Sequence, residues 1–226
     1  MNDAKLTRRG SLLGFGGLLL AALGWRTASS EGAGPAGVAS GAVSCVLTPE
    51  QTEGPYYIAD EKVRRNITEG RAGVPLILRL RVVDVSTCRP VKDAAVDIWH
   101  ADALGVYSGF GAGAGSRTFM RGIQRTDANG LARFRSVYPG WYRGRTVHIH
   151  VKVHVEGNVV HTGQLYFPDS LTDKVFRRKP YNRRGKRTTR NASDSVFVNG
   201  GRRSMLSLRK SGSAYIASIT MGVSLS

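Results

Sequence analysis

The feature that most constrains the fold of this chain is a two-residue alternation of apolar and polar side chains, which recurs from about residue 74 to residue 223. The clearest example runs from Val147 to Val155, where five aliphatic residues alternate with His148, His150, Lys152 and His154. Successive side chains of a β-strand point to opposite faces, so this pattern predicts a strand with one apolar face. No long stretch of the same region keeps the 3.6-residue period of an amphipathic helix.

Several further segments repeat this alternation and are separated by turn residues. Strands are expected at residues 75–85, 94–100, 131–137, 159–167 and 215–223. A glycine-rich loop at 109–116 and an Asn-Gly turn at 126–130 lie between them. Short strands joined in this way favour an all-β sandwich or barrel with long loops. Helices are expected to be short, and residues 169–176 are the best candidate.

Residues 1–30 have the pattern of an export signal. Lys5, Arg8 and Arg9 precede an uncharged stretch rich in Leu and Gly at residues 10–24. The arginine pair favours the twin-arginine route, and an ordinary secretory signal is the alternative. A membrane-spanning helix is less favoured, because the stretch is shorter than the roughly 20 residues that a bilayer requires.

The composition changes after this segment. Residues 31–43 are mostly Gly, Ala and Ser, which predicts a flexible linker. The functional domain is therefore expected at residues 44–226, in a periplasmic or extracellular protein.

Export makes the two cysteines of the chain interpretable. Cys45 and Cys88 are the only cysteines, and disulfides persist in oxidising compartments. We therefore expect one disulfide, which would stabilise the fold by about 3–4 kcal/mol in the chain-entropy account.

The formal net charge is +17 at pH 7, and much of the excess lies at residues 174–190, called the basic segment below. The favoured interpretation is a solvated loop, with weak association with anionic envelope surfaces as the alternative. Few aromatic residues interleave with these cations, so no dedicated nucleic-acid partner is expected. The sequence leaves the oligomeric state open, with a homodimer as one alternative.

Two phenols and two imidazoles lie close together along the sequence. They are Tyr107, Tyr142, His148 and His150. The histidines share one face of the expected strand, about 6–7 Å apart along it, so both could reach one metal. A His-x-His pair alone is a weak signal, because a polar strand face is usually solvated. With two phenolate oxygens added, the set favours Fe(III).

Short motifs in a characteristic order extend this pattern over the chain. They are Glu53-Gly54-Pro55-Tyr56-Tyr57, Asp97-Ile98-Trp99-His100-Ala101, Gly105-Val106-Tyr107, Arg121-Gly122 with the turn at 126–130, the block at 139–150, and Gln164-Leu165-Tyr166-Phe167. From about residue 47 to residue 223 the chain resembles the intradiol ring-cleavage dioxygenases, the family of the catechol and protocatechuate enzymes. It looks most like their exported, single-domain branch.

The resemblance implies a β-sandwich and assigns roles to individual residues. Tyr107 and His148 resemble the equatorial iron ligands of the family, and Tyr142 and His150 resemble the axial pair. Tyr142 would also act as a base, while Arg145 and Gln164 resemble residues that face the substrate.

The implied activity is the cleavage of a catechol by non-haem Fe(III) and O2 to a cis,cis-muconate-type diacid. Only Arg143 and Gly144 separate Tyr142 from Arg145, a shorter loop than in the catechol and protocatechuate enzymes, so the particular aromatic diol is left open. The alternative is a non-catalytic exported β-sandwich module that binds anions through the basic segment.

Overall fold

The computed structural model describes residues 45–59, 62–110 and 114–225. The export signal predicted at residues 1–30 and the linker predicted at residues 31–43 lie outside the described residues. In the described part of the chain, no helix is both long and apolar enough to span a membrane. The described residues cover most of the expected functional domain.

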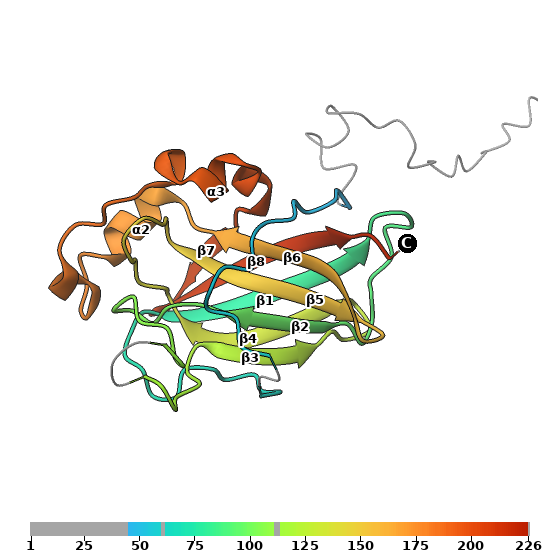
Figure 1. The fold of residues 1–226 in the computed structure, drawn as a ribbon, viewed down its shortest axis with the longest axis horizontal. Coiled ribbons are helices and arrows are strands. Elements are labelled where there is room, and N and C mark those ends of the chain that lie inside the picture. The colour runs from blue at the N-terminus through green and yellow to red at the C-terminus, as the bar shows by residue number, and fades with distance from the viewer. Residues whose placement is uncertain (1–44, 60–61, 111–113, 226) are drawn as a thin grey trace, which may run out of the picture.

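The strands of the described residues form two four-stranded sheets (Figure 1). The first sheet has the order β4-β1-β8-β7 and the second has the order β3-β2-β5-β6. Neighbouring strands are antiparallel, except that β1 and β8 run parallel. The strands are β1 (Pro75–Asp84), β2 (Ala95–Trp99), β3 (Arg121–Arg125), β4 (Leu131–Val137), β5 (His148–Val155), β6 (Asn158–Tyr166), β7 (Ser207–Ser211) and β8 (Ala214–Val223). The predicted β-sandwich is confirmed.

Aliphatic side chains that alternate along the strands fill the space between the sheets. Leu76, Leu78 and Leu80 of β1 are at most 1% exposed, and Ile149 and Val151 of β5 are fully buried. All five belong to one hydrophobic cluster. Fully burying a side chain of this size contributes about 1.5–3 kcal/mol. The face that the alternation predicted to be apolar is therefore the core.

The opposite face of β5 is also buried where the strand begins. His148 and His150 are 3% and 1% exposed. A second, mainly aromatic cluster covers this face, made of Trp99, Ala101 and Tyr107 with Tyr56, Tyr57, Phe110 and Tyr142 packed against them. The two histidines therefore lie outside the sandwich core, in a separate buried region.

Helices in the described residues are short, as predicted. The helix expected at 169–176 is α2 (Asp169–Val175), and α3 spans Ser195–Val198. Three 3-10 turns accompany them, η1 (Tyr181–Arg184), η2 (Asn191–Ser193) and η3 (Gly201–Ser204). Figure 1 shows α2 and α3 at one side of the sandwich, with α3 beside β6.

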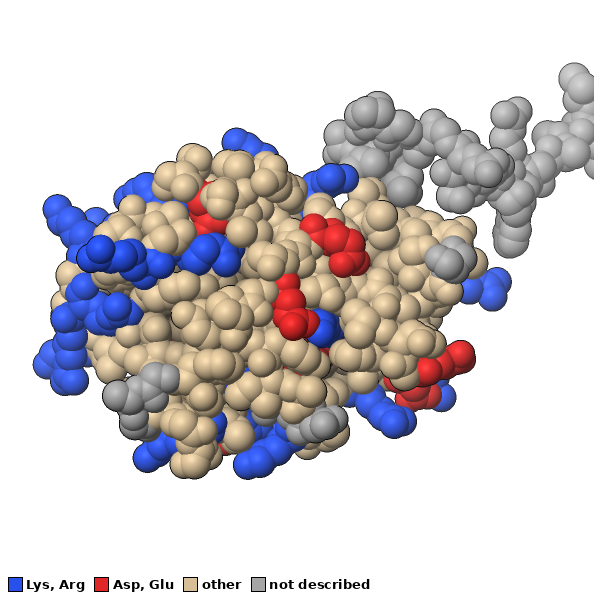
Figure 2. Space-filling view, in the orientation of Figure 1, with Lys and Arg blue, Asp and Glu red and all other residues tan. Residues whose placement is uncertain are grey.

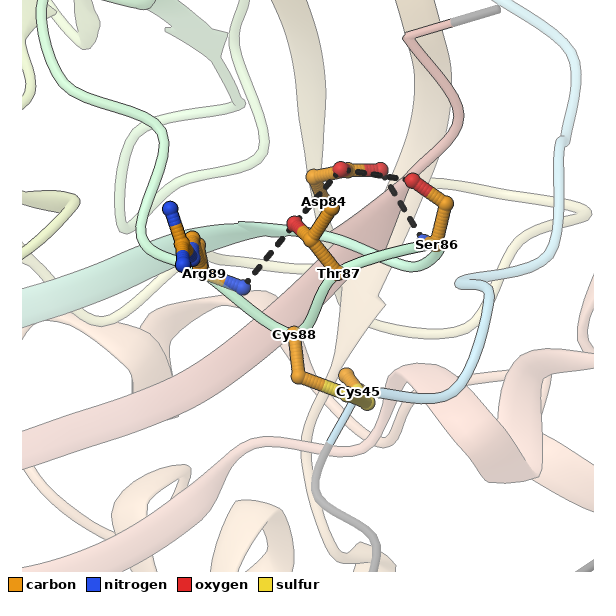
Figure 3. Close-up of a disulfide and its surroundings, with 6 residues drawn as sticks. All are labelled: Cys45, Asp84, Ser86, Thr87, Cys88 and Arg89. Atoms are coloured by element: carbon orange, nitrogen blue, oxygen red, sulfur yellow. Dashed lines mark hydrogen bonds between the residues drawn. A yellow bond between two sulfur atoms is a disulfide. The ribbon is translucent and has the colours of Figure 1, made fainter. Parts of the chain in front are cut away.

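Cys45 and Cys88 form the predicted disulfide, with their Cα atoms 5.2 Å apart (Figure 3). Cys88 lies in the turn after β1, where the carboxylate of Asp84 accepts hydrogen bonds from Ser86 and Thr87. The disulfide therefore ties the first described residue to the end of a central strand.

The basic segment is only partly the solvated loop that the sequence predicted. The side chain of Arg187 is 4% exposed and pairs with two carboxylates of α2, those of Asp169 and Asp173. Arg184 donates hydrogen bonds to the backbone carbonyls of Leu104 and Trp141, in the loops that carry Tyr107 and Tyr142 of the aromatic cluster. Other cations are exposed, among them Arg177, Arg178 and Lys179. Figure 2 shows Lys and Arg side chains gathered at the end of the molecule where α2 lies.

Candidate metal centre

His148 and His150 stand side by side on one face of β5. Their Nε2 atoms are 3.0 Å apart. Trp99 of β2 pairs with His150 across the sheet, and the two rings stack with centroids 4.9 Å apart. The sheet and this stacking contact together set the positions of both imidazoles.

The protonation of His148 is fixed by a backbone group. Its Nδ1 lies 2.7 Å from the carbonyl oxygen of Thr146, which can only accept, so Nδ1 carries the proton and Nε2 presents a lone pair. Burial, together with the charge of Arg145, lowers the pKa of His148 to about 3. Burial and the neighbouring His148 lower the pKa of His150 well below its ordinary value. Both imidazoles are neutral at neutral pH, which is the form that binds metals.

Tyr142 reaches these histidines from the turn that precedes β5. Its hydroxyl oxygen is 3.2 Å from Nε2 of His148. The turn includes Gly144, whose φ of 87° favours glycine. Burial raises the pKa of Tyr142, and the charge of Arg145 acts in the opposite direction. Tyr142 is also partly exposed, whereas the other three members of the set are buried.

Tyr107 comes from the loop that follows β2. The carboxylate of Asp102 holds this loop by accepting hydrogen bonds from two of its backbone N–H groups. The ring centroid of Tyr107 lies 5.7 Å from that of Tyr142 and 6.2 Å from that of His150. Its buried hydroxyl makes no hydrogen bond of acceptable geometry. Burial, with Tyr142 nearby, raises the pKa of Tyr107 well above its ordinary value.

These features fit a ferric ion. The Tyr107 hydroxyl interacts only with the neighbouring Tyr142 hydroxyl and makes no hydrogen bond of good geometry, and the lone pair of His148 lies beside a second imidazole nitrogen. A cation bound between these groups would satisfy both and would lower both phenol pKa values, because positive charge favours the phenolate. Hard phenolate oxygens with two imidazoles suit Fe(III).

The tyrosines are essential to this interpretation. The described residues contain no group of three or more His, Cys, Asp or Glu side chains placed to hold a metal ion. A metal ion at His148 and His150 would find its further side-chain oxygen donors in Tyr107 and Tyr142, which the structure places beside the two histidines. The structure brings these four predicted residues together.

Arg145 and Gln164 contact each other beside the four-residue cluster. Nη2 of Arg145 donates to Oε1 of Gln164 at 2.5 Å, and Nε of Arg145 donates to Oδ2 of Asp194 at 2.9 Å. The amide nitrogen of Gln164 donates to the backbone carbonyl of Thr52 at 2.8 Å. Both ends of the Gln164 amide are therefore bonded to protein, although the resemblance implied that this side chain faces the substrate.

Two contributors to the site were not singled out from the sequence. Thr146 presents its backbone carbonyl to His148. Asp194 contacts Arg145 although the two residues are 49 positions apart in the chain. Thr146 lies in the quoted block at 139–150 but acts through its backbone, which its residue type does not reveal, and Asp194 lies in no quoted motif and depends on long-range folding. Gly54, in contrast, lies in a quoted motif: a Cβ there would come 3.2 Å from Cε1 of His150, and its φ is 72°.

The chain matches known proteins over much of its length. A family model described as a dioxygenase matches residues 52–179. Catechol 1,2-dioxygenase 2 of Acinetobacter lwoffii is 37% identical over 134 residues, which are 56% of this chain and 46% of that protein. A chlorocatechol 1,2-dioxygenase of Cupriavidus pinatubonensis is 30% identical over 148 residues, 54% of this chain and 56% of that protein. The chain spans about half the length of the curated relatives that it matches.

Solved structures agree over a larger share of the chain. The intradiol ring-cleavage dioxygenase from Tetranychus urticae superposes with a TM-score of 0.75 at 36% identity, covering 80% of this chain and 95% of that one. The dioxygenase domain of a carbohydrate-binding fusion protein from Streptomyces sp. SirexAA-E has a TM-score of 0.63 at 31% identity, covering 80% and 100%. Fold and matches together place the chain in a family of dioxygenases. The chain belongs to the intradiol ring-cleavage dioxygenase family, as its motifs predicted.

Proposed function

We propose that this chain uses non-haem Fe(III) and O2 to cleave a catechol between its two hydroxyl-bearing carbons. The observation that carries the proposal is the buried cluster of two neutral histidines and two tyrosines. When bound, ferric iron would supply a Lewis acid that makes the chelated diol reactive toward O2. One oxygen atom of O2 enters each carboxyl group of a cis,cis-muconate-type diacid, so no further reductant is needed.

Tyr142 is the proposed base for a catechol hydroxyl. It is the one member of the cluster that is partly open to solvent, so an arriving diol meets it first. Its phenolate form would accept the proton, because a catechol hydroxyl held by ferric iron would be more acidic than the hydroxyl of a free tyrosine. The charge of Arg145 favours that phenolate form by lowering the pKa of Tyr142 against the effect of burial.

Arg145 is the proposed electrostatic stabiliser of the substrate. Negative charge builds on the ring as it loses its protons, and a fixed guanidinium in a water-poor site stabilises that charge strongly. Arg145 suits this task because its side chain is only 18% exposed and because it retains its charge at any physiological pH.

Aromatic side chains are proposed to limit water at the site. Tyr56 stacks on Tyr107 with centroids 4.2 Å apart, and Phe110 meets Tyr56 edge-on at 5.3 Å. Such packing keeps the surroundings of the cluster apolar, which strengthens electrostatic interactions inside it.

The visible spectrum of the purified protein tests this function directly. Ferric reconstitution should give a tyrosinate-to-iron charge-transfer band, and anaerobic catechol should shift it. Tyr107→Phe should weaken the band and lower the iron content. Tyr166→Phe is the matched control, because Tyr166 is buried nearby but bonds to Gln51 and Gln164, so its band should match that of the wild type. A protein that stays colourless after reconstitution would contradict the proposal.

We also propose that the protein is exported by the twin-arginine route. The pattern of residues 1–30 supports this, and so does the disulfide, since such bonds persist in oxidising compartments. Replacing Arg8 and Arg9 by Lys keeps the charge but removes the pair that the route requires. The variant should remain in the cytoplasm, and undiminished export would contradict this route.

A further inference from the structure

We propose that Asp194 is a positioning residue that fixes the guanidinium of Arg145 beside the candidate metal centre. This inference rests on the proposed function and deepens it. Asp194 follows η2 and lies beyond the segment, residues 52–179, that the family model matches. Its segment returns to the beginning of β5 after α2 and the basic segment, and Figure 1 shows α3, which it caps, beside β6.

The carboxylate of Asp194 joins two separate parts of the fold. Oδ2 accepts hydrogen bonds from Nε of Arg145 at 2.9 Å and from the backbone N–H of Thr146 at 2.6 Å. Oδ1 accepts from the backbone N–H groups of Val196 and Phe197, each at 2.9 Å, and so caps α3. The residue is 0% exposed. Its position is therefore fixed from both sides, and it transmits that rigidity to Arg145.

Gln164 holds a second edge of the same guanidinium. It accepts from Nη2 of Arg145, donates to the backbone of Thr52, and also accepts from the hydroxyl of Tyr166 at 3.1 Å. Among the described residues, Nη1 of Arg145 makes no hydrogen bond to protein. A guanidinium held at Nε and Nη2 thus keeps Nη1 for the bound diol.

The energetics favour positioning over simple stabilisation. A buried ion pair often stabilises a fold no better than apolar residues would, because both charges lose their hydration. Burial raises the pKa of Asp194, but hydrogen bonds from Thr146, Phe197 and Arg145 more than offset this and lower it. The pair is therefore ionised at neutral pH. What it adds is a fixed direction for the guanidinium, which an electrostatic stabiliser needs.

Asp194→Asn tests the proposal with little change in shape. Asparagine keeps one oxygen to cap α3 but turns the side that faces Arg145 from acceptor to donor. With catechol, kcat should fall about 10- to 100-fold, the range typical for residues that orient a metal site from outside. KM and the charge-transfer band should stay close to wild type. A lost or shifted band would place the effect at His148, through Thr146, and would overturn the proposal.

A double-mutant cycle tests whether Asp194 acts through Arg145 or independently of it. If Asp194 acts through Arg145, Asp194→Asn should change kcat by less than about twofold once Arg145 is already Leu. A further tenfold loss in that background would overturn the proposal. Asp173→Asn is the matched control, because it removes an ion-paired aspartate of α2 that lies outside the site, and its kcat should equal that of the wild type.

One readout does not depend on turnover or iron. In the metal-free protein, the Nε–H proton of Arg145, followed by 15N NMR, should exchange with water at least about tenfold faster in Asp194→Asn, since a hydrogen bond to a charged group is lost. Unchanged exchange would overturn the positioning role. An inactive, colourless wild type would instead contradict the proposed function, and the exchange measurement would still decide whether Asp194 holds Arg145.

Discussion

Arg145 and Arg187 are both largely buried and both pair with carboxylates. They differ in how many of their hydrogen-bond donors remain for a ligand. Arg187, in the basic segment, meets two carboxylates of α2, Asp169 and Asp173, so its guanidinium is saturated by protein. Arg145, at the beginning of β5, meets one carboxylate and one amide oxygen. Within the described part of the chain, Arg145 therefore retains an unbonded Nη1 donor for a ligand, and its single carboxylate partner balances its charge without exceeding it.

This difference shows why a count of cations says little about function. The basic segment holds many Lys and Arg residues, and much of its charge is either neutralised by α2 or exposed to water. Arg145, just before β5, lies among phenols and neutral imidazoles that are largely buried, where its charge acts at low dielectric. Local burial, and not the number of charges, decides which arginine can do chemistry.

The largest effect should come from removing Arg145. Arg145→Leu should keep iron and its charge-transfer band but lower kcat by about 10²- to 10³-fold, the cost of losing one preorganised electrostatic donor. Steady-state kinetics on iron-loaded protein measure this. Arg187→Leu is the comparison variant, and its kcat should stay within about threefold of wild type. Equal losses in the two variants would break the distinction between the two arginines.

Acid should destabilise the folded protein by protonating His100, which is fully buried. Burial lowers the pKa of His100 to about 4, against about 6.5 in an unfolded chain. The unfolded state therefore binds a proton first. Stability is fully present above pH 6.5 and falls by up to about 3 kcal/mol as the pH drops from 6.5 to 4.

The measurement is chemical unfolding of the metal-free protein across this pH range. His100→Gln should remove this share of the pH dependence, although it also loses the contacts of Nδ1 with Ala101 and Nε2 with Ser136. His154→Gln, on the less buried end of β5, should change the slope much less. An unchanged slope in His100→Gln would contradict the prediction.

A smaller effect is expected for the stability of Arg187→Leu. Its two carboxylate partners are about a third exposed and can rehydrate, so the loss should be about 2 kcal/mol, less than the roughly 3–5 kcal/mol expected when a fully buried pair is broken. Denaturant titration gives the value. Arg190→Leu is the control, because Arg190 is 56% exposed and, within the described part of the chain, forms its one ion pair with Asp173; the substitution should cost less than about 1 kcal/mol.

The smallest effect should come from single exposed cations of the basic segment. If the protein associates with anionic phospholipid vesicles at low salt, Arg178→Gln should weaken that association by about 1 kcal/mol, roughly fivefold. The difference should vanish at high salt, where charges are screened. Vesicle co-sedimentation measures it, and kcat should be unchanged. Association that does not depend on salt would contradict an electrostatic origin.

Much of the fold could be predicted because its strands alternate. The strands expected at 75–85, 94–100, 131–137, 147–155, 159–167 and 215–223 are present with ends shifted by at most one residue. β3 and β7 were not predicted. Their sequences, RGIQR and SLRKS, contain little apolar alternation, and β7 is an edge strand with mostly exposed side chains. Pairing with a neighbour defines these strands, and a local pattern cannot report it.

The site residues were predictable only where a local sequence pattern or motif marks them. The spacing of His148 and His150 follows from strand geometry, and the tyrosines were recognised through the motifs of a family. The contact between Arg145 and Asp194 has no such pattern, because a lone aspartate far along the chain has many other uses. The burial of Arg187 in the basic segment was not predicted for the same reason, since its partners on α2 are set by folding and not by composition.

The parallel pairing of β1 and β8 determines when the first sheet can be completed during synthesis. Leu76 of β1 lies opposite Tyr215 of β8, and β8 separates β1 from β7. A ribosome must release residues near 223 before this sheet closes, so β1 keeps one unpaired edge while most of the chain emerges. Open edges invite association with other nascent chains. We therefore expect the growing polypeptide to depend on chaperones until β8 is available.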